Sequence, residues 1–272
     1  MAKRKYYLDT RVLTAFFFAA MPFVAFGSFI VVNMAKNQLR DSVGASLEQR
    51  AVQTKLALER HLGEQVLNLR VLGLEPVVHK ALEEPTEPMT EDEARRLNEA
   101  WTAGDATLQE AILENALAAR LRTVSALRPG LRSLQLVDRS GRVIAASGTG
   151  GRIAHSESAW FKELSSQEGE AQSWIGDIQR PQGQTHNFLE IAYPIWDDDV
   201  IFRGAVRGLL DASDLYGVLA PVRVGRTGHA TLIRVTDGMI LASDEGDRIL
   251  TASFPGYASL AGALEGFPIA AD

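Results

Sequence analysis

Residues 134–147 read LQLVDRSGRVIAAS, and this stretch decides the fold. Two short apolar runs flank the sequence DRSG at residues 138–141, where polar residues and a glycine favour a tight turn. Such a pattern predicts a β-hairpin. A second hairpin is predicted further along the chain. There, residues 188–195 alternate between apolar and other side chains, and residues 200–210 can form the return strand.

The segment before the first hairpin predicts helices. Residues 36–73 contain no proline and repeat apolar side chains at spacings of three, four or seven, as one long helix would. Thr90 and Glu93 have the spacing of a capping box, which marks a helix start. The following residues, up to position 127, are mostly helical in pattern, with a break expected at Gly104.

Shorter elements fill the rest of the chain. Residues 158–165 and 211–222 predict helices, and residues 172–177 predict a short strand. With the two hairpins and the long helix, this order predicts an α+β fold in which helices pack on one antiparallel sheet.

Residues 12–35 contain no charged side chain over 24 positions. A helix of that length spans roughly 36 Å, which exceeds the ~30 Å thickness of a hydrocarbon layer. The basic residues before it predict a cytoplasmic tip at residues 1–11 and an extracytoplasmic remainder. The alternative is a signal peptide cleaved near Ala25-Phe26-Gly27, but the apolar run is too long for one. We therefore predict a transmembrane helix anchored in the inner (cell) membrane.

The composition disfavours several kinds of chemistry. The chain has no cysteine, so disulfides and thiolate catalysis are excluded. Its five histidines lack metal-ligand spacing, and the three acids at 197–199 are typical of a solvated hairpin tip. The net charge of −6 includes +3 on residues 1–11, and the acidic remainder disfavours nucleic acid as a partner. We expect no enzyme activity, cofactor or metal site within these residues.

A hairpin pattern occurs a second time. Residues 239–243 repeat the pattern of apolar and small residues at 143–147 at an offset of 96 residues. Each copy comes after a polar turn with a glycine. Few residues remain beyond the second copy. We therefore expect either a small variant of the first unit or a chain that continues beyond Asp272.

The chain resembles the double Cache (dCache) family of PAS-like extracytoplasmic sensor domains in bacterial transmembrane receptors. The resemblance rests on LQLVDRSGRVIAAS, AWF, the run from SWIGD to WDDD, FRGAVRGLLDASDLYGVL and VGRTGHATLIRVTDGMILAS. It implies a stalk helix with a membrane-distal Cache unit at residues 36–224 and an incomplete membrane-proximal unit at residues 225–272. It also implies a receptor that signals across the membrane, a homodimer formed through the stalk helix, and an output module that these residues do not show.

The resemblance also implies a ligand site. Trp160 and Phe161 match an aromatic pair in amino-acid-binding members, Asp211 matches the aspartate that holds the ligand amine, and Asp177 resembles a further acidic position. Ser158 stands where those members have an arginine, so an amine without a carboxylate, or another ligand altogether, is as good a candidate as an amino acid.

Simpler interpretations remain for each of these residues. Trp160 and Phe161 can be core residues, Asp211 can cap the next helix, and Asp177 can be a turn residue.

Two other functions stay open. The chain can be a membrane-tethered adhesion or scaffold module without a small-molecule ligand, which a closed, apolar-filled first unit would favour. It can also be the regulatory front of a membrane enzyme, which differs from a receptor only in the domain attached after residue 272.

Overall fold

The computed structural model describes residues 10–84, 86–128, 130–167, 172–180, 186–224 and 227–264. The chain divides into two compact units, Met1–Gln53 and Thr54–Asp272. Most of the expected cytoplasmic tip, residues 1–9, lies outside the described residues. The second unit contains the predicted sheet and its covering helices.

Helix α1 runs from Thr10 to Gly73 and includes the whole of the helix predicted at residues 36–73, which is thereby confirmed. Within the part of the chain that the structure describes, no helix is both long and apolar enough to cross a membrane. In the predicted membrane segment, the side chains of residues 12–20 and 22–25 lie outside that part.

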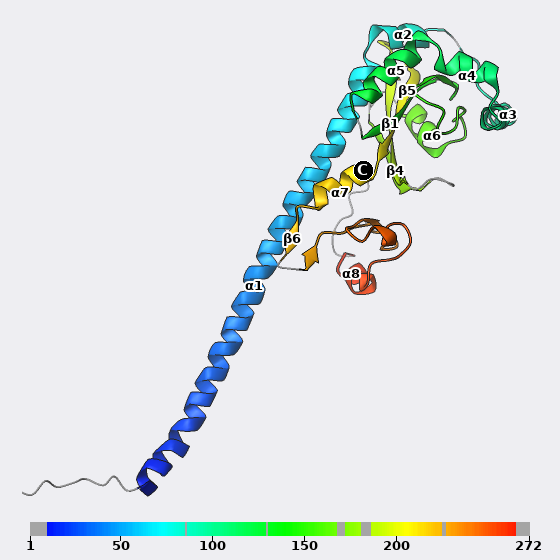
Figure 1. The fold of residues 1–272 in the computed structure, drawn as a ribbon. Helices are drawn as coiled ribbons and strands as arrows, with labels where there is room; N and C mark the ends of the chain where they lie inside the picture. The colour runs from blue at the N-terminus through cyan, green and yellow to red at the C-terminus, as the bar shows by residue number, and fades with distance from the viewer. Residues whose placement is uncertain are drawn as a thin grey trace, which may run out of the picture. The chain divides into compact units, whose positions relative to one another are not determined.

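Four short helices come after α1 (Figure 1). They are α2 (Pro76–Leu82), α3 (Glu91–Thr102), α4 (Ala106–Leu113) and α5 (Ala116–Ala126). The side chains of Thr90, Asp105 and Asn115 accept hydrogen bonds from the first turns of α3, α4 and α5. The predicted cap at Thr90 and the predicted break at Gly104 are confirmed, whereas the break at Asn115 was not predicted. The Glu93 side chain pairs with Arg142, so only half of the capping box forms.

Five antiparallel strands form the central sheet in the order β2-β1-β5-β4-β3. Their bounds are Leu131–Asp138 (β1), Val143–Ala146 (β2), Trp174–Gln179 (β3), Phe188–Trp196 (β4) and Phe202–Asp211 (β5). Both predicted hairpins are therefore confirmed, β1 with β2 and β4 with β5. Helix α6 (Ala159–Ser166) precedes β3, and α7 (Ser213–Leu219) comes after β5.

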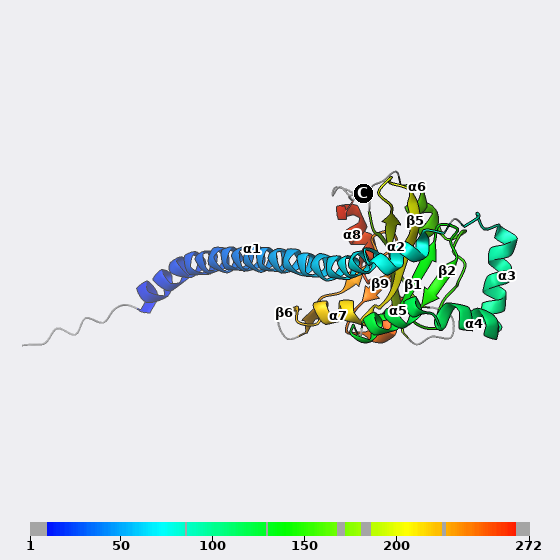
Figure 2. The same ribbon diagram turned by 90° about the horizontal axis from the view of Figure 1, so that it is seen from above.

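The two faces of the sheet pack against different partners. On one side, called the helix face, Leu136, Ile191 and Val206 share a core with Leu69 of α1 and Leu121 of α5. On the other side, called the loop face, Val137, Ala192 and Ala205 share a second core with α6 and residues 137–153. Helices α3 and α4 lie beyond β2 at one end of the sheet (Figure 2). The expected α+β architecture is thereby confirmed.

In the C-terminal part, the elements among the described residues are small. They are β6 (Arg223–Val224), β7 (Gly228–His229), β8 (Leu232–Ile233), β9 (Ile240–Ala242), a 3₁₀ turn (Gly246–Arg248) and α8 (Tyr257–Leu264). Strands β8 and β9 pair in an antiparallel hairpin, as the repeated sequence predicts. Gly238, with φ +70°, supplies the left-handed residue of its turn. Leu232, Leu241 and Leu250 pack against the helix-face core.

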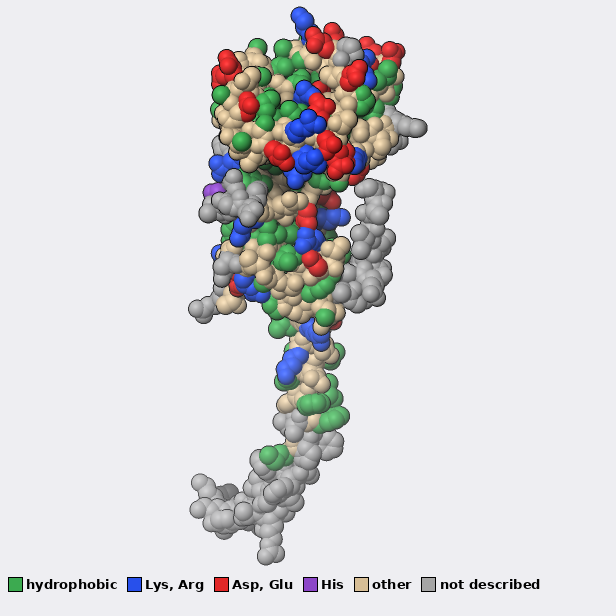
Figure 3. All heavy atoms as spheres, turned by 90° about the vertical axis from the view of Figure 1, so that its right-hand side faces the viewer, with side chains coloured by type: hydrophobic (Ala, Val, Ile, Leu, Met, Phe, Trp, Pro, Cys, Tyr) green, Lys and Arg blue, Asp and Glu red, His purple; other side chains and the backbone are tan. Residues whose placement is uncertain are grey.

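Charged side chains of both signs are interspersed on the face of the molecule that Figure 3 shows. The sheet separates a packed helical side from a loop side. On the loop side, charged side chains of the strands gather around a cavity.

Candidate functional site

A cavity of about 420 Å³ lies between the loop face of the sheet and the glycine-rich loop at residues 148–151. We call it the sheet pocket. Its volume is within the usual range for small-molecule sites. It is lined by Arg132, Ser133, Gly148, Thr149, Gly150, Gly151, Asp177, Gln179, Phe188, Glu190, Arg207 and Leu209. Residues 148–151 form the loop wall of the pocket, and the other lining residues come from four strands, β1, β5, β4 and β3. The floor of the pocket is therefore part of the sheet.

A buried ion pair lies in this floor. The Arg207 guanidinium pairs with the Glu190 carboxylate of the neighbouring strand, and their side chains are only 9% and 19% exposed. Arg207 also donates to the Gln135 side-chain oxygen at 2.7 Å. Burial lowers the pKa of the Arg207 guanidinium, and this effect outweighs the nearby Glu190 carboxylate, which raises it. A pair this well enclosed fixes both side chains, because removing either partner would leave an unpaired buried charge.

His155 extends the network behind Arg207. Its Nε2 lies 3.2 Å from the Gln135 side-chain oxygen and 3.1 Å from the Arg152 carbonyl oxygen, two acceptors that assign the proton to Nε2. Burial, together with the nearby Arg207 charge, lowers the pKa of His155 to about 3. The imidazole is therefore neutral at physiological pH, which lets it sit beside a guanidinium without repulsion.

The structure places Trp160 and Phe161 in the core on the loop face of the sheet, where they are 3% and 6% exposed. The Trp160 ring lies 5.1 Å from His155 and 5.5 Å from Phe161 between centroids. Neither residue lines the sheet pocket. Their position agrees with core packing.

Asp211 lies at the end of β5 with its side chain buried. It accepts hydrogen bonds from the Arg132 guanidinium at 2.7 and 3.1 Å and from the Ser213 backbone N–H at 2.9 Å. Burial alone would raise the pKa of Asp211, but these hydrogen bonds hold it below its usual value. Asp211 does not line the pocket itself, and instead positions Arg132, which does.

Of the four predicted site residues, Asp177 lines the sheet pocket. Its side chain is 39% exposed and pairs with the Arg234 guanidinium, which comes from the β8–β9 hairpin. Arg234 is also held by Asp237, with Nε–Oδ1 at 3.0 Å and Nη2–Oδ2 at 2.8 Å. Hydrogen bonds to Asp237 and then to Asp177 raise the pKa of Arg234 above its usual value.

Ser133 has a buried hydroxyl without a hydrogen-bond partner among the described residues. A buried, unsatisfied hydroxyl is unfavourable, so this residue stores a local energetic cost next to the pocket. Ser133, Arg132, Glu190 and Arg207 were not predicted from the sequence. The available signal was the presence of charged residues within strands otherwise built for burial.

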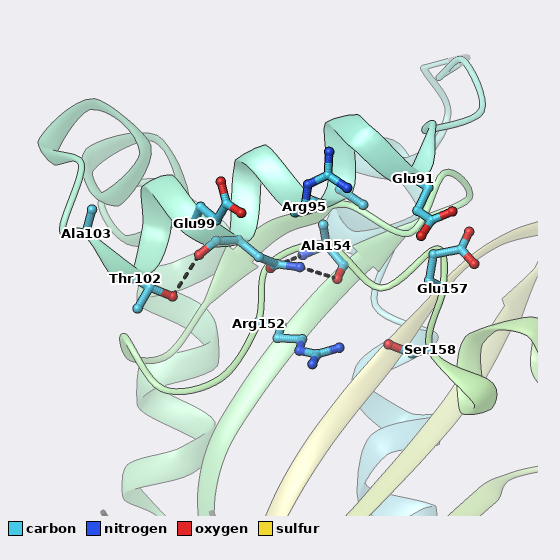
Figure 4. Close-up of a pocket in the computed structure, with 11 residues that line it drawn as sticks. Glu91, Arg95, Glu99, Thr102, Ala103, Arg152, Ala154, Glu157 and Ser158 are labelled. Atoms are coloured by element: carbon cyan, nitrogen blue, oxygen red, sulfur yellow. Dashed lines mark hydrogen bonds between the residues drawn. The ribbon is translucent and has the colours of Figure 1, made fainter. Parts of the chain in front are cut away.

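A second hollow, of about 650 Å³, lies between α3 and residues 152–158 (Figure 4). Its central polar residue is already engaged, because Asn98 donates to the Ala154 carbonyl oxygen and accepts from the Ile153 and Ala154 backbone N–H groups. Arg95 pairs with Asp92 on its own helix. These contacts clip the loop to α3, so the sheet pocket is the better candidate site.

No protein-family model and no curated protein matches the sequence. Several solved structures do match this chain in fold. The extracellular domain of vpHK1S-Z8, named as a histidine kinase, aligns with a TM-score of 0.52 and 16% identity over 81% of this chain and 77% of that one.

Two chemoreceptor domains align with a TM-score of 0.48 each. They are the ligand-binding domain of PctC from Pseudomonas aeruginosa PAO1 in complex with GABA (14% identity, 76% of this chain, 77% of that one) and that of Tlp3 from Campylobacter jejuni in complex with 4-methylisoleucine (13%, 74%, 69%). The vpHK1S-Z8 alignment shows that this chain shares the fold of that extracellular domain, in agreement with the fold that the resemblance to Cache-type domains implied.

Proposed function

We propose that the chain is the extracytoplasmic small-ligand sensor region of a membrane signal-transduction receptor, and that the sheet pocket binds the ligand. The observation that carries this proposal is a cavity of about 420 Å³ on the loop face, lined by charged side chains of both signs. A scaffold module without a ligand would gain nothing from keeping such groups in a cavity rather than filling it with apolar side chains.

The lining favours a small ligand that carries an amine, alone or with a carboxylate. Asp177 offers a partly exposed carboxylate for an ammonium group, and Arg132 offers a guanidinium for a carboxylate. Phe188 and Leu209 supply apolar contact for a short side chain. In this proposal Asp211 positions Arg132, while Trp160 and Phe161 belong to the core on the same face of the sheet. No catalytic step is assigned to residues 1–272.

The proposal includes an anchor at residues 12–35, with the N-terminus in the cytoplasm and the sensor in the periplasm or outside the cell. It is supported by 24 consecutive uncharged positions preceded by basic residues. It also includes a homodimer formed through α1, supported by exposed apolar side chains along that helix, among them Leu39, Val43 and Leu47. Residues 225–272 are assigned in this proposal to a second Cache unit.

The test is ligand binding to the whole purified chain in detergent. A panel of the twenty standard L-amino acids, γ-aminobutyrate and propylamine is screened by thermal shift, and hits are measured by calorimetry. We expect at least one binder, and we expect Asp177→Asn to weaken it about tenfold or more because the ammonium loses its charged partner.

Asp198→Asn is the matched control, since Asp198 lies at the exposed tip of the β4–β5 hairpin. Its affinity should equal that of the unaltered chain. Failure of every compound to bind, or equal losses in the two variants, would contradict the sheet pocket as the ligand site.

A further inference from the structure

The Asp177 carboxylate faces two different parts of the molecule. It lines the sheet pocket from β3, which is the edge strand of the sheet. It also pairs with Arg234, whose side chain comes from the β8–β9 hairpin and does not line that pocket. One carboxylate therefore joins the candidate ligand site to the C-terminal part of the chain.

Arg234 has a second partner of its own. Asp237, three residues further on, accepts two hydrogen bonds from the same guanidinium, and its carboxylate also accepts from the Met239 backbone N–H at 3.0 Å. If Arg234 leaves Asp177, it keeps a charge partner within its own turn. Losing the contact to β3 then leaves no unpaired charge on the hairpin, so opening the Asp177–Arg234 pair costs little free energy.

Other contacts hold the C-terminal part in place when this pair opens. Arg180, at the end of β3, donates to the Ile249 carbonyl oxygen at 3.3 Å, and Leu232 and Leu241 pack against the helix-face core. The consequence of losing the Asp177 contact is thus local, confined to the hairpin turn at residues 234–239.

We propose that Arg234 is a ligand-released latch, in which a cationic group entering the sheet pocket takes over Asp177 and frees the β8–β9 turn. The inference rests on the proposed function, since it names how occupation of that same pocket reaches the rest of the chain. The ligand cation and Arg234 compete for one carboxylate, so each weakens the binding of the other by the same factor.

Because the competition is reciprocal, it predicts the direction in which the ligand affinity changes when Arg234 is replaced. Removing the competitor in Arg234→Gln should strengthen binding of propylamine, which carries the cation alone, by about 2- to 5-fold, the range of a partly exposed ion pair. Arg248→Gln is the matched control, because Arg248 lies in the same C-terminal part and pairs with Glu245 three residues away. It should leave the affinity unchanged.

Hydrogen exchange of the full chain tests the latch directly. We expect faster exchange in peptides covering residues 232–240 in Arg234→Gln and in Asp177→Asn. The unaltered chain should show the same change on adding saturating propylamine, and no change with an equal concentration of sodium chloride. Propylamine should add nothing in Arg234→Gln.

Two results would overturn the latch while leaving the sensor intact. One is propylamine or an amino acid binding the pocket without any change in exchange at residues 232–240. The other is an Arg234→Gln variant that binds propylamine no better than Arg248→Gln. Failure of every compound to bind would instead remove the proposed function, and the latch with it.

Discussion

His155 shows how burial fixes the chemistry of one residue. It is 2% exposed, and its ring bonds to Gln135 and to the Arg152 backbone. Because its pKa in the folded chain is lowered to about 3, the unfolded chain binds a proton more readily than the folded chain does. The stability that His155 contributes is complete above its ordinary pKa of 6.5 and is lost progressively as the pH falls toward 3.

The lowered pKa of His155 predicts how the stability of the chain changes in acid. Between pH 6.5 and 4.5 the unaltered chain should lose ~2–3 kcal/mol of unfolding free energy through His155 alone. His155→Gln should be less stable at pH 7 but should lack this part of the decline. Denaturant unfolding at several pH values measures it, with the exposed His186→Gln as control. A decline of the same steepness in His155→Gln as in the control would disprove the assignment.

The residues of the site were only partly accessible from the sequence. Asp177 was found because its position resembles that of an acidic residue in a known family, and it does line the pocket. Arg207 and Glu190 were missed because an isolated sequence does not show that β4 and β5 pair Ala192 with Arg207 and Glu190 with Leu209. Register across strands decides which charged side chains meet, and it is a property of the folded sheet.

At the scale of elements, the close pairing of β1 with β5 depends on Gly204. It sits opposite Asp138 on β1 and opposite Ile195 on β4, with φ +154°. A Cβ at this position would clash with the Val137 carbonyl oxygen of the neighbouring strand. Glycine is therefore needed here both for its backbone conformation and for space.

We predict opposite effects for two glycine-to-alanine changes. Gly204→Ala should destabilise the chain by about 2–4 kcal/mol, because backbone strain adds to the clash in a packed sheet. Gly217→Ala should stabilise it by about 0.5–1 kcal/mol, because Gly217 is exposed within α7 and its Cβ would meet open space. Denaturant midpoints of the two variants check both signs. Equal midpoints would contradict the different roles assigned to the two glycines.

Element types were easier to predict than their ends. The strand expected at residues 172–177 is Trp174–Gln179, and the helix expected at 211–222 is Ser213–Leu219. Asp211 shows the reason, because it pairs with Phe188 in the sheet and so extends β5 instead of starting the helix. Partner strands set such ends, and the local sequence does not record them.

At the scale of the whole molecule, the proposed dimer concerns α1 alone. Leu39, Val43 and Leu47 are exposed apolar residues four positions apart, so they lie along one side of the helix. Asp41 lies on the opposite side, since two residues of a helix turn through about 200°. An exposed apolar stripe on a helix favours a matching stripe from a second copy.

The absence of native cysteine makes this simple to test. In membranes from expressing cells, Val43→Cys should form an oxidised dimer on mild oxidation, whereas Asp41→Cys should remain largely monomeric. Disulfide formation requires Cα atoms about 4.4–6.8 Å apart, which only the facing side of paired helices provides. Monomers for both variants, or equal cross-linking of both, would contradict a dimer along this stripe.

Trp101 gives the molecule a built-in optical probe. Its indole N–H donates to the Thr149 carbonyl oxygen at 3.1 Å, and Thr149 belongs to the loop that walls the sheet pocket. Indole emission responds to the hydrogen bonding and polarity around the ring. Any ligand that shifts this loop therefore changes the light that Trp101 emits, and occupation of the pocket can be followed without attaching a dye.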